Sequence, residues 1–575
     1  MTTLPPGSIL MLGAFIVPLL QGRARQVFMV ALPLLGLGHV LMLPEGTTSM
    51  EMMGMTLELV RVDRLSRLFG IVFHLAALIT CIYSLHVKDR VQQVSALAYS
   101  GSAIAAVFAG DLITLFIWWE VTAFTSVFLI WARRTERANR VGLRYLLIQV
   151  ASGVLLLAGA IVHYADTGSI AFDYLGDGHG GVSGLGAALI LLAFGIKAAF
   201  PLLHSWMKDA YPEATVTGTV WMASFTTKLA IYALARGFAG TELLILIGAT
   251  MTAFPIFFAV LENDLRRVLA YSLNNQLGFM VVGIGIGTEL AINGAVAHAF
   301  AHIIYKALLF MSMGAVLFRT GTIRANQLGG LYRSMPWTAF FCVIGSLSIS
   351  AFPLFSGFVS KSMTMTAAAS EHHTFAFLVL LFASAGVMDH SGIKVPFFAF
   401  FAKPHGEAKT CKEAPLNMLV AMGIAAVLCV GLGVFYQPLY SLLPHQEVLH
   451  SESFHGPYDT THVVTQLQLL LFSAAAFVFL VKTKLYPAEI TSVNLDTDHV
   501  YRRWLPSTAE AVHSTASQLG VRLRERTEAS VLDVLAVVRA LHSPTGGLLG
   551  TPWPSGQTAM WAAVLLAVSL LLYYS

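Results

Sequence analysis

Five charged side chains stand inside the most apolar parts of this sequence. Glu120 ends the run Leu-Phe-Ile-Trp-Trp-Glu, and Lys197, Lys228, Lys306 and Lys361 each lie in or beside a later apolar run. A charge at the centre of a lipid bilayer costs about 2.5–3.5 kcal/mol on insertion scales, so such residues are rare without a function. A carboxylate followed by four lysines in successive apolar runs indicates a route for charge across a membrane.

Histidines accompany one of these lysines. His298, His302 and Lys306 follow one another at intervals of four residues, which places them on one face of a helix. The histidine spacing also suits a metal ion, but no third ligand is evident in the sequence. We therefore interpret the pair as part of a proton relay, for which imidazole is suited near neutral pH.

Two further polar groups occur in apolar surroundings. His204 follows Pro201 and could extend the relay, whereas Asp389, His390 and Lys394 form a cluster within a later apolar run. The cluster could carry protons or could be a local salt bridge. A buried ion pair stabilises a protein only weakly, so for Glu120 beside Lys197 the sequence favours a functional pair over a static one.

The composition defines the class of protein that must hold these residues. Of the 575 residues, 56% are hydrophobic and 11% are charged, whereas soluble domains carry about 25% charged residues. The chain is therefore predicted to be an all-α polytopic membrane protein. It has no P-loop, no dinucleotide-binding fingerprint and no cysteine spacing for a metal or iron–sulfur cluster, so we expect no cofactor and no bound metal.

Apolar windows of about 20 residues predict about sixteen spans, the first retained rather than cleaved as a signal. The loops at 23–25, 88–90, 133–140, 266–267, 319–333 and 403–412 are basic, whereas 163–188 has no Lys or Arg. By the positive-inside rule the basic loops face the cytoplasm and both termini lie outside. Arg61, Arg64 and Arg67 depart from this pattern, and we expect an interfacial turn there. The predicted location is a prokaryotic cell membrane.

Proline interrupts two of the predicted spans. Pro201 follows Lys197 by four residues, and Pro353 precedes Lys361 by eight. Proline removes a backbone hydrogen bond, and lipid cannot satisfy the freed carbonyl, so protein or water must cover each break. Two interrupted spans in corresponding halves, each with a lysine, are typical of transporters with inverted repeats.

The segment before the last span is different. Apolar residues keep helical spacing through the otherwise charged stretch 507–543, which predicts an amphipathic helix about 55 Å long. We expect it to lie along the cytoplasmic surface or against a partner subunit. The predicted divisions are N-terminal spans 1–110, a first half-channel 111–240, a second half-channel 241–403, further spans 404–483, the amphipathic segment 484–557 and a final span 558–575.

Several motifs, in order, resemble the proton-translocating antiporter-like family of complex I membrane subunits and Mrp-type multisubunit Na⁺/H⁺ antiporters. They are Trp118-Trp-Glu120, Ile196-Lys-Ala-Ala-Phe-Pro-Leu-Leu-His204, Lys228-Leu-Ala-Ile-Tyr232, Asp264-Leu-Arg-Arg, His298-Ala-Phe-Ala-His302 and Ser356-Gly-Phe-Val-Ser-Lys361. Within the family the chain is most similar to the D-type components of Mrp antiporters. The long C-terminal tail instead resembles the lateral helix of some complex I subunits.

The resemblance implies a core of about fourteen helices with two inverted five-helix repeats. It implies a proton path from Glu120 and Lys197 through Lys228 and the His298–Lys306 segment to Lys361. Partners would be other membrane subunits, with protons and a monovalent cation as the transported ions. Two alternatives stay open: a pumping subunit of a complex I-like quinone oxidoreductase or membrane hydrogenase, and a proton-flux partner in inorganic-carbon uptake.

Overall fold

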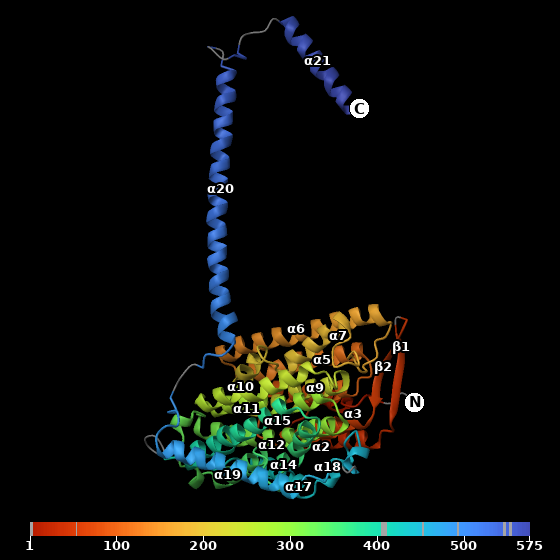
Figure 1. Ribbon diagram of the computed structural model, residues 1–575, viewed down its shortest axis with the longest axis vertical. Helices are drawn as coiled ribbons and strands as arrows, with labels where there is room; N and C mark the ends of the chain where they lie inside the picture. Colours follow the sequence, from red (N-terminus) through yellow and green to blue (C-terminus); the bar gives the residue numbers. More distant parts are fainter. Residues whose placement is uncertain are drawn as a thin grey trace. The chain divides into compact units, whose positions relative to one another are not determined.

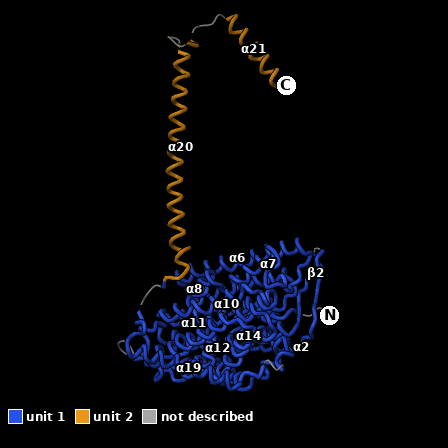
Figure 2. The backbone as a smooth tube through the Cα atoms, in the orientation of Figure 1, with its two compact units in different colours: residues 1–494 blue, residues 495–575 orange. Residues whose placement is uncertain are grey.

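The computed structural model describes residues 4–52, 54–403, 411–450, 454–490, 494–543, 545, 548–550 and 555–574. Most of the basic loop 403–412, including Lys409, lies outside the described residues. The chain divides into two compact units, Met1–Asn494 and Leu495–Ser575 (Figures 1 and 2).

Unit 1 is a bundle of helices with one β-hairpin (Figure 1). Its elements are α1 (Ser8–Ile16), α2 (Gly22–Met42), β1 (Gly46–Met52), β2 (Met55–Val62), α3 (Arg64–Tyr83), α4 (Arg90–Val107), α5 (Leu112–Trp131), α6 (Glu136–Thr167), α7 (Gly184–Ala198), α8 (Ser205–Glu213), α9 (Val216–Gly237), α10 (Leu243–Leu261), α11 (Leu265–Ile286), α12 (Glu289–Thr320), α13 (Pro336–Ile349), α14 (Ser356–Ser370), α15 (Thr374–Val387), α16 (Lys394–Pro396), α17 (Leu416–Val434), α18 (Gln437–Ser441) and α19 (Thr460–Lys482).

The helical membrane fold predicted from composition is confirmed. Among the described residues, ten helices are long and apolar enough to cross a membrane. The count is lower than the roughly sixteen spans that the apolar windows predict. Helices α7 and α13 are not among the ten, because each is short and ends at a break. Helix α14 was not predicted as a separate helix.

Helix α12 lies at the centre of unit 1. In its most apolar window 94% of the residues are buried, against 39% for α6 at the periphery. It packs against α9, α11, α13, α14 and α17. The helix that carries His298, His302 and Lys306 is therefore shielded from lipid by protein on all sides.

The two breaks repeat the same backbone solution. Both contain the tetrapeptide Ala-Phe-Pro-Leu, at 199–202 between α7 and α8 and at 351–354 between α13 and α14. In both, the alanine and the leucine have positive φ: 63° and 70° in the first, 57° and 74° in the second. Non-glycine residues rarely adopt this conformation, so its occurrence at matching places marks two corresponding helix breaks.

Protein groups cover the carbonyls that the breaks free, as the membrane argument requires. At the first break the indole Nε1 of Trp206 donates to Ile196 O at 2.9 Å. At the second, Lys361 Nζ donates to Ile349 O at 3.0 Å, and Gln466 Nε2 donates to Ser350 O at 3.0 Å. Gln466 belongs to α19, so the second break is completed by a helix distant in sequence.

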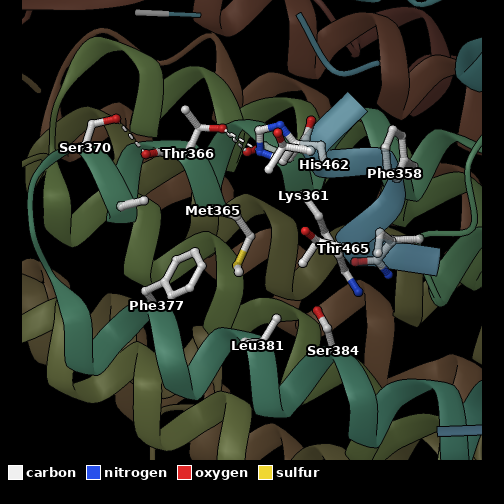
Figure 3. A pocket seen from close by; sticks show the side chains of 15 residues that line it. Phe358, Lys361, Met365, Thr366, Ser370, Phe377, Leu381, Ser384, His462 and Thr465 are labelled. Atoms are coloured by element: carbon white, nitrogen blue, oxygen red, sulfur yellow. Dashed lines mark hydrogen bonds between the residues drawn. The ribbon is translucent and has the colours of Figure 1, made fainter. Parts of the chain in front are cut away.

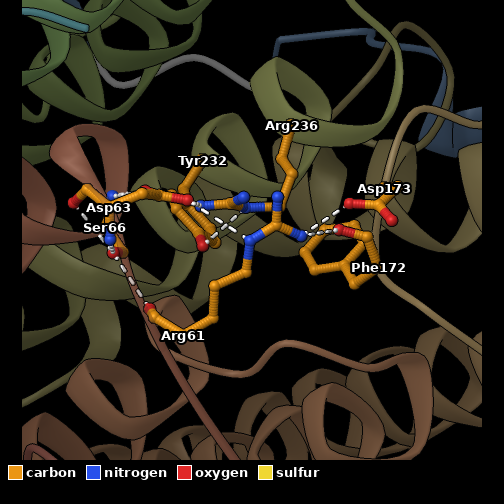
Figure 4. A network of polar contacts seen from close by, with 7 residues as sticks. All are labelled: Arg61, Asp63, Ser66, Phe172, Asp173, Tyr232 and Arg236. Atoms are coloured by element: carbon orange, nitrogen blue, oxygen red, sulfur yellow. Dashed lines mark hydrogen bonds and ion pairs between the residues drawn. The ribbon is translucent and has the colours of Figure 1, made fainter. Parts of the chain in front are cut away.

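The hairpin of β1 and β2 was not predicted. It contains Arg61, one of the arginines that depart from the charge pattern of the loops. The strands pair antiparallel, and Arg61 at the end of β2 contacts Asp173 at 2.6 Å (Figure 4). Asp63 caps α3 by accepting from Ser66 N, and it receives both hydrogen bonds of Arg236 Nη2 at 2.7 and 2.9 Å. These ion pairs hold the end of β2 to α9 and to the loop at Asp173. Arg61 thus lies in a strand and not in a turn, whereas Arg64 and Arg67 lie at the start of α3.

Unit 2 contains the predicted amphipathic helix and the last span. Helix α20 runs over Leu505–Leu541 as one continuous helix of 37 residues, and α21 covers Ser555–Tyr574. Neither helix has a buried residue. Within unit 2, Val512, Leu519 and Leu523 of the apolar stripe of α20 are each more than half exposed.

Candidate functional site

The helices that carry the predicted site residues form one connected series. Helix α7 packs against α9, α9 against α12, and α12 against α14. The side chains of Lys197, Lys228, Lys306 and Lys361 are 0–4% exposed, as are those of His298 and His302. Glu120 on α5 is half-buried. The chain therefore places its predicted lysines and histidines in successive neighbouring helices within the protein interior.

Lys197 is held by α5, and not through an ion pair with Glu120. Its Nζ donates to Trp119 O at 3.0 Å and to Thr122 Oγ1 at 2.9 Å, and it lies 4.1 Å from the centre of the Trp119 ring. Within the described residues Glu120 Oε1 is buried without a hydrogen bond. The expected Glu120–Lys197 pair is thus open in this structure, although the two groups interact electrostatically.

Helix α9 places Lys228 between the two halves. Its Nζ donates to Ala223 O at 2.6 Å, within its own helix. It interacts electrostatically with His298, His302 and Lys306 of α12. This position suits the predicted link between Lys197 and the histidine-bearing helix.

A hydrogen-bond chain runs through the second half. Ser360 Oγ lies 3.0 Å from His298 Nδ1, Tyr305 OH lies 3.3 Å from His298 Nε2, and Tyr305 donates to Gln276 Oε1 at 3.1 Å. Ser360 is the neighbour of Lys361 in sequence. Sequence reasoning missed Ser360, Tyr305 and Gln276. Only Tyr305 had a visible signal, because it lies seven residues from His298 on the same helix face.

Other polar groups of the interior lack protein partners. In the described part of the chain, both ring nitrogens of His302, the Nζ of Lys306 and the side-chain amide of Asn274 are buried without a hydrogen bond. Buried polar groups are nearly always hydrogen-bonded to protein or to ordered water. Water bound beside these groups would supply the missing hydrogen bonds.

Lys361 lies at one end of a pocket of about 280 Å³ between α14, α15 and α19. Its Nζ is 4.9 Å from the centre of the Phe279 ring, in addition to its bond with Ile349 O. Figure 3 places Thr465 and Ser384 at the same end of the pocket as Lys361, and Ser370 and Phe377 at the other. Lys361, one of the lysines predicted from the sequence, thus lines a cavity.

The cluster at 389–394 does not form a local salt bridge. Lys394 pairs with Glu489 at 2.8 Å and donates to Val260 O and Glu262 O. His390 Nδ1 lies 2.9 Å from Ser391 Oγ. Asp389 lies in a π-helical turn, Met388–Ile393, which ends just before Lys394. The partner Glu489 was missed because it follows the last span of unit 1 in a polar stretch.

His204 lies at the first break, as its sequence position indicates. It is 1% exposed and precedes α8, with its ring 4.7 Å from the ring of Phe254.

Across the described residues no group of three or more His, Cys, Asp or Glu gathers to hold a metal ion. His298 contacts Ser360 and Tyr305 through its ring nitrogens, and the ring of His302 packs against that of Tyr305.

This geometry defines a polytopic helical membrane protein with an interior series of lysines and histidines and two matching broken helices. Residues 109–387 match the family described as NADH:quinone oxidoreductase/Mrp antiporter, transmembrane. The chain is 31% identical over 365 residues to the D-type component of the Na⁺/H⁺ antiporter of Alkalihalophilus pseudofirmus, a match that covers 60% of this chain and 73% of that protein. The chain therefore belongs to the NADH:quinone oxidoreductase/Mrp antiporter family.

Two further comparisons agree with this assignment. Hydrogenase-4 component B of Escherichia coli is 28% identical over 413 residues, covering 64% of this chain and 61% of that protein. A chain of the Mrp complex from Dietzia sp. has the same fold, with a TM-score of 0.69 at 22% identity. That match covers 82% of this chain and 99% of the Dietzia chain.

Proposed function

We propose that this chain is the proton-translocating subunit of a multisubunit monovalent cation/proton antiporter in a prokaryotic inner membrane. Protons would move along Glu120, Lys197, Lys228, the His298–Lys306 segment and Lys361. The observation that carries the proposal is the burial of these amines and imidazoles in helices that contact one another in the same order. Burying so many ionisable groups costs stability, so their presence in the interior favours a function in transport.

The mechanism that we propose is electrostatic coupling between neighbours. Lys306 interacts electrostatically with both Lys228 and Lys361, so a proton on one of these neighbours opposes a proton on Lys306. The carboxylate of Glu120 has the opposite effect on Lys197. Movement between the open arrangement seen here and a closed Glu120–Lys197 pair would hold or release a proton, which passes to Lys228 and then to the hydrogen-bond chain around His298.

In this proposal residues 111–240 form the first half-channel and 241–403 the second, with the two breaks at corresponding places. The basic loops face the cytoplasm and both termini lie outside. The Alkalihalophilus relative, whose name is that of a Na⁺/H⁺ antiporter component, supports exchange for a monovalent cation. The complete protein would work with the other membrane subunits of its complex.

A second candidate is a pumping subunit of a redox-driven complex, with the same relay and a different partner. It is favoured by α20, whose exposed apolar stripe suits a neighbouring subunit, and by the similarity to hydrogenase-4 component B. In that complex a redox subunit would supply the energy that cation exchange supplies in the first candidate.

The test uses the complete complex in sealed membrane vesicles. A pH gradient is imposed, and Na⁺, K⁺ or Li⁺ is added while internal pH is recorded. Glu120→Ala, Lys197→Ala and Lys361→Ala are compared with Glu371→Ala and Lys412→Ala, whose side chains are exposed. Cation-dependent dissipation that only the three relay variants lose supports antiport.

Two other results would point elsewhere. An assembled complex without any cation response would reject the antiporter and favour the redox-driven pump. Flux that survives all three relay substitutions would mean that the buried charges are structural.

A further inference from the structure

Helix α19 forms a wall of the pocket beside Lys361. It contributes Thr461, His462, Thr465 and Gln466, which face Phe358 to Ser370 of α14 and Phe377 to Ser384 of α15 (Figure 3). This helix lies beyond residues 109–387, the part that matches the family. The pocket is therefore completed by a segment that the family match does not include.

The pocket extends from Lys361 toward the end of the bundle where α14 ends and α15 and α19 begin. Ser384 and Gln466 lie with Lys361 at the inner end, whereas Ser370 and Thr461 belong to helix ends. A volume of about 280 Å³ exceeds the roughly 30 Å³ that one water occupies in the liquid. Apolar side chains line most of the pocket, and the polar atoms that water would bind there belong to Lys361, Thr366, His462, Thr465 and Gln466.

His462 stands in this pocket with one ring nitrogen already used. Thr366 Oγ1 lies 3.0 Å from His462 Nε2 and donates its single hydrogen to Ser362 O at 2.9 Å. The hydroxyl can then only accept from the ring, so Nε2 carries the hydrogen of the neutral imidazole. That leaves Nδ1 as the atom that can take a further proton.

A carboxylate faces that atom. Asp459 Oδ2 lies 3.9 Å from His462 Nδ1, and the cap of α19 holds it in place because it accepts from Thr461 N at 3.0 Å. Within the described residues Nδ1 makes no hydrogen bond. A proton on Nδ1 would form an ion pair with Asp459. The other charged group that lines the pocket is Lys361, and α15 contributes no charged side chain to it.

The geometry points to His462 as the proton acceptor of an exit path from Lys361 that is walled by α19. A proton leaves the Lys361 ammonium, crosses the pocket through water and binds His462 Nδ1, giving an imidazolium beside Asp459; loss of the same proton to the aqueous face restores the neutral ring. Thr366, the contact of His462, lies five residues beyond Lys361, about 7–8 Å along α14. The transfer thus needs intervening water.

This inference rests on the proposed function, and thiol labelling tests the pocket independently of flux. Leu381→Cys and Ser384→Cys are made in a Cys411→Ser background, because the other three cysteines are buried. A small membrane-impermeant thiosulfonate is added to each side of sealed vesicles that hold the complete complex. We expect both to react from the side that carries Asp459 and not from the side of the basic loops.

The matched control is Leu378→Cys, which lies on the same helix and is 56% exposed on the outer face of unit 1. A thiol that faces lipid stays protonated and unreactive, so this variant should label far more slowly. Equal labelling of Leu378→Cys and Ser384→Cys, or labelling of Ser384→Cys from the basic-loop side, would overturn the exit path.

Flux measurements then test His462 itself. We expect His462→Ala to lower proton flux by about tenfold or more, because a positioned acid–base group accelerates proton transfer by roughly 10²–10⁴. Asp459→Asn should have a smaller effect in the same direction. His455→Ala, an exposed histidine of the same segment, should leave flux unchanged.

The outcomes separate the two proposals. Full flux in His462→Ala alongside loss of flux in Lys361→Ala would overturn the role of His462 and leave the relay standing. A wild-type complex without proton flux would reject the proposed function, and the exit path with it, whatever the labelling pattern.

Discussion

The carboxylate of Glu120 lies directly against the backbone of Gly153. A Cβ atom at residue 153 would lie 1.4 Å from Glu120 Oε1, far inside any van der Waals contact. Helix α6 thus leaves room for this carboxylate only because residue 153 has no side chain. The glycine sets where Glu120 can stand relative to Lys197.

Gly153→Ala is therefore expected to displace the Glu120 side chain and to lower proton flux nearly as much as Glu120→Ala. The measurement is flux in sealed vesicles with equal amounts of assembled complex. Val154→Ala, at an exposed neighbouring position of α6, should behave as wild type. Normal flux in Gly153→Ala would mean that the position of Glu120 is not critical.

Tyr305→Phe should interrupt the hydrogen-bond chain between His298 and Gln276 while keeping the ring. We expect a fall in proton flux with little change in assembly, because only one hydroxyl is lost. The matched control is Tyr83→Phe, a buried tyrosine that donates to Met311 O in a similar way at 2.9 Å. An equal loss of flux in both variants would indicate a general packing effect and contradict the relay role of Tyr305.

The ion pair of Asp63 and Arg236 makes a prediction about pH. Burial would raise the pKa of Asp63, but the Arg236 guanidinium and the Ser66 N–H outweigh it and hold the pKa below its ordinary value of 3.8. A depressed folded-state pKa gives stability that is present above the unfolded pKa and is lost as pH falls through the folded pKa. The pair therefore stabilises at pH 7 and fails in acid.

Asp63→Asn is expected to lower the free energy of unfolding by about 1–2 kcal/mol at pH 7, the value for a charged hydrogen bond reduced for partial exposure. As pH falls through the lowered pKa of Asp63, the difference from wild type should shrink, because the wild-type carboxylate becomes neutral and loses its ion pair. Thermal unfolding of the purified complex measures both. Glu45→Gln, which alters the exposed pair with Arg67, should cost little at either pH.

The apolar stripe of α20 predicts a partner. Replacing Leu519 and Leu523 together by glutamine should leave unit 1 folded, because residues 1–494 form a compact unit of their own. It should reduce co-purification of the other subunits, since the stripe would no longer bury apolar surface. Glu525→Gln on the polar face is the control. Unchanged co-purification in the double variant would exclude this stripe as the interface.

The charged part of the site could be predicted from sequence because a lysine in an apolar run has few explanations. Lys197, Lys228, Lys306 and Lys361 all lie in the interior, in neighbouring helices, as their sequence context indicates. What the sequence could not give is the partner of each group. Lys197 binds Thr122 on another helix, a contact that tertiary packing alone decides.

Neutral polar residues were harder to predict. Ser360 and Gln276 complete the chain around His298, yet uncharged residues in spans carry little penalty and so leave no signal in the sequence.

The β-hairpin was missed for another reason. Its strands, Gly46–Met52 and Met55–Val62, are short and lie directly between two spans, where hydropathy dominates the pattern.

The second break has a consequence for exchanging parts between relatives. The carbonyl of Ser350 is satisfied by Gln466, which lies 116 residues further along the chain. Consider a chimera that takes residues 241–403 from this protein but takes α19 from a relative, or lacks α19. The carbonyl of Ser350 would then have no donor in an apolar setting. The smallest transplantable second half of this protein therefore runs through Lys482, well past the point where the family match ends.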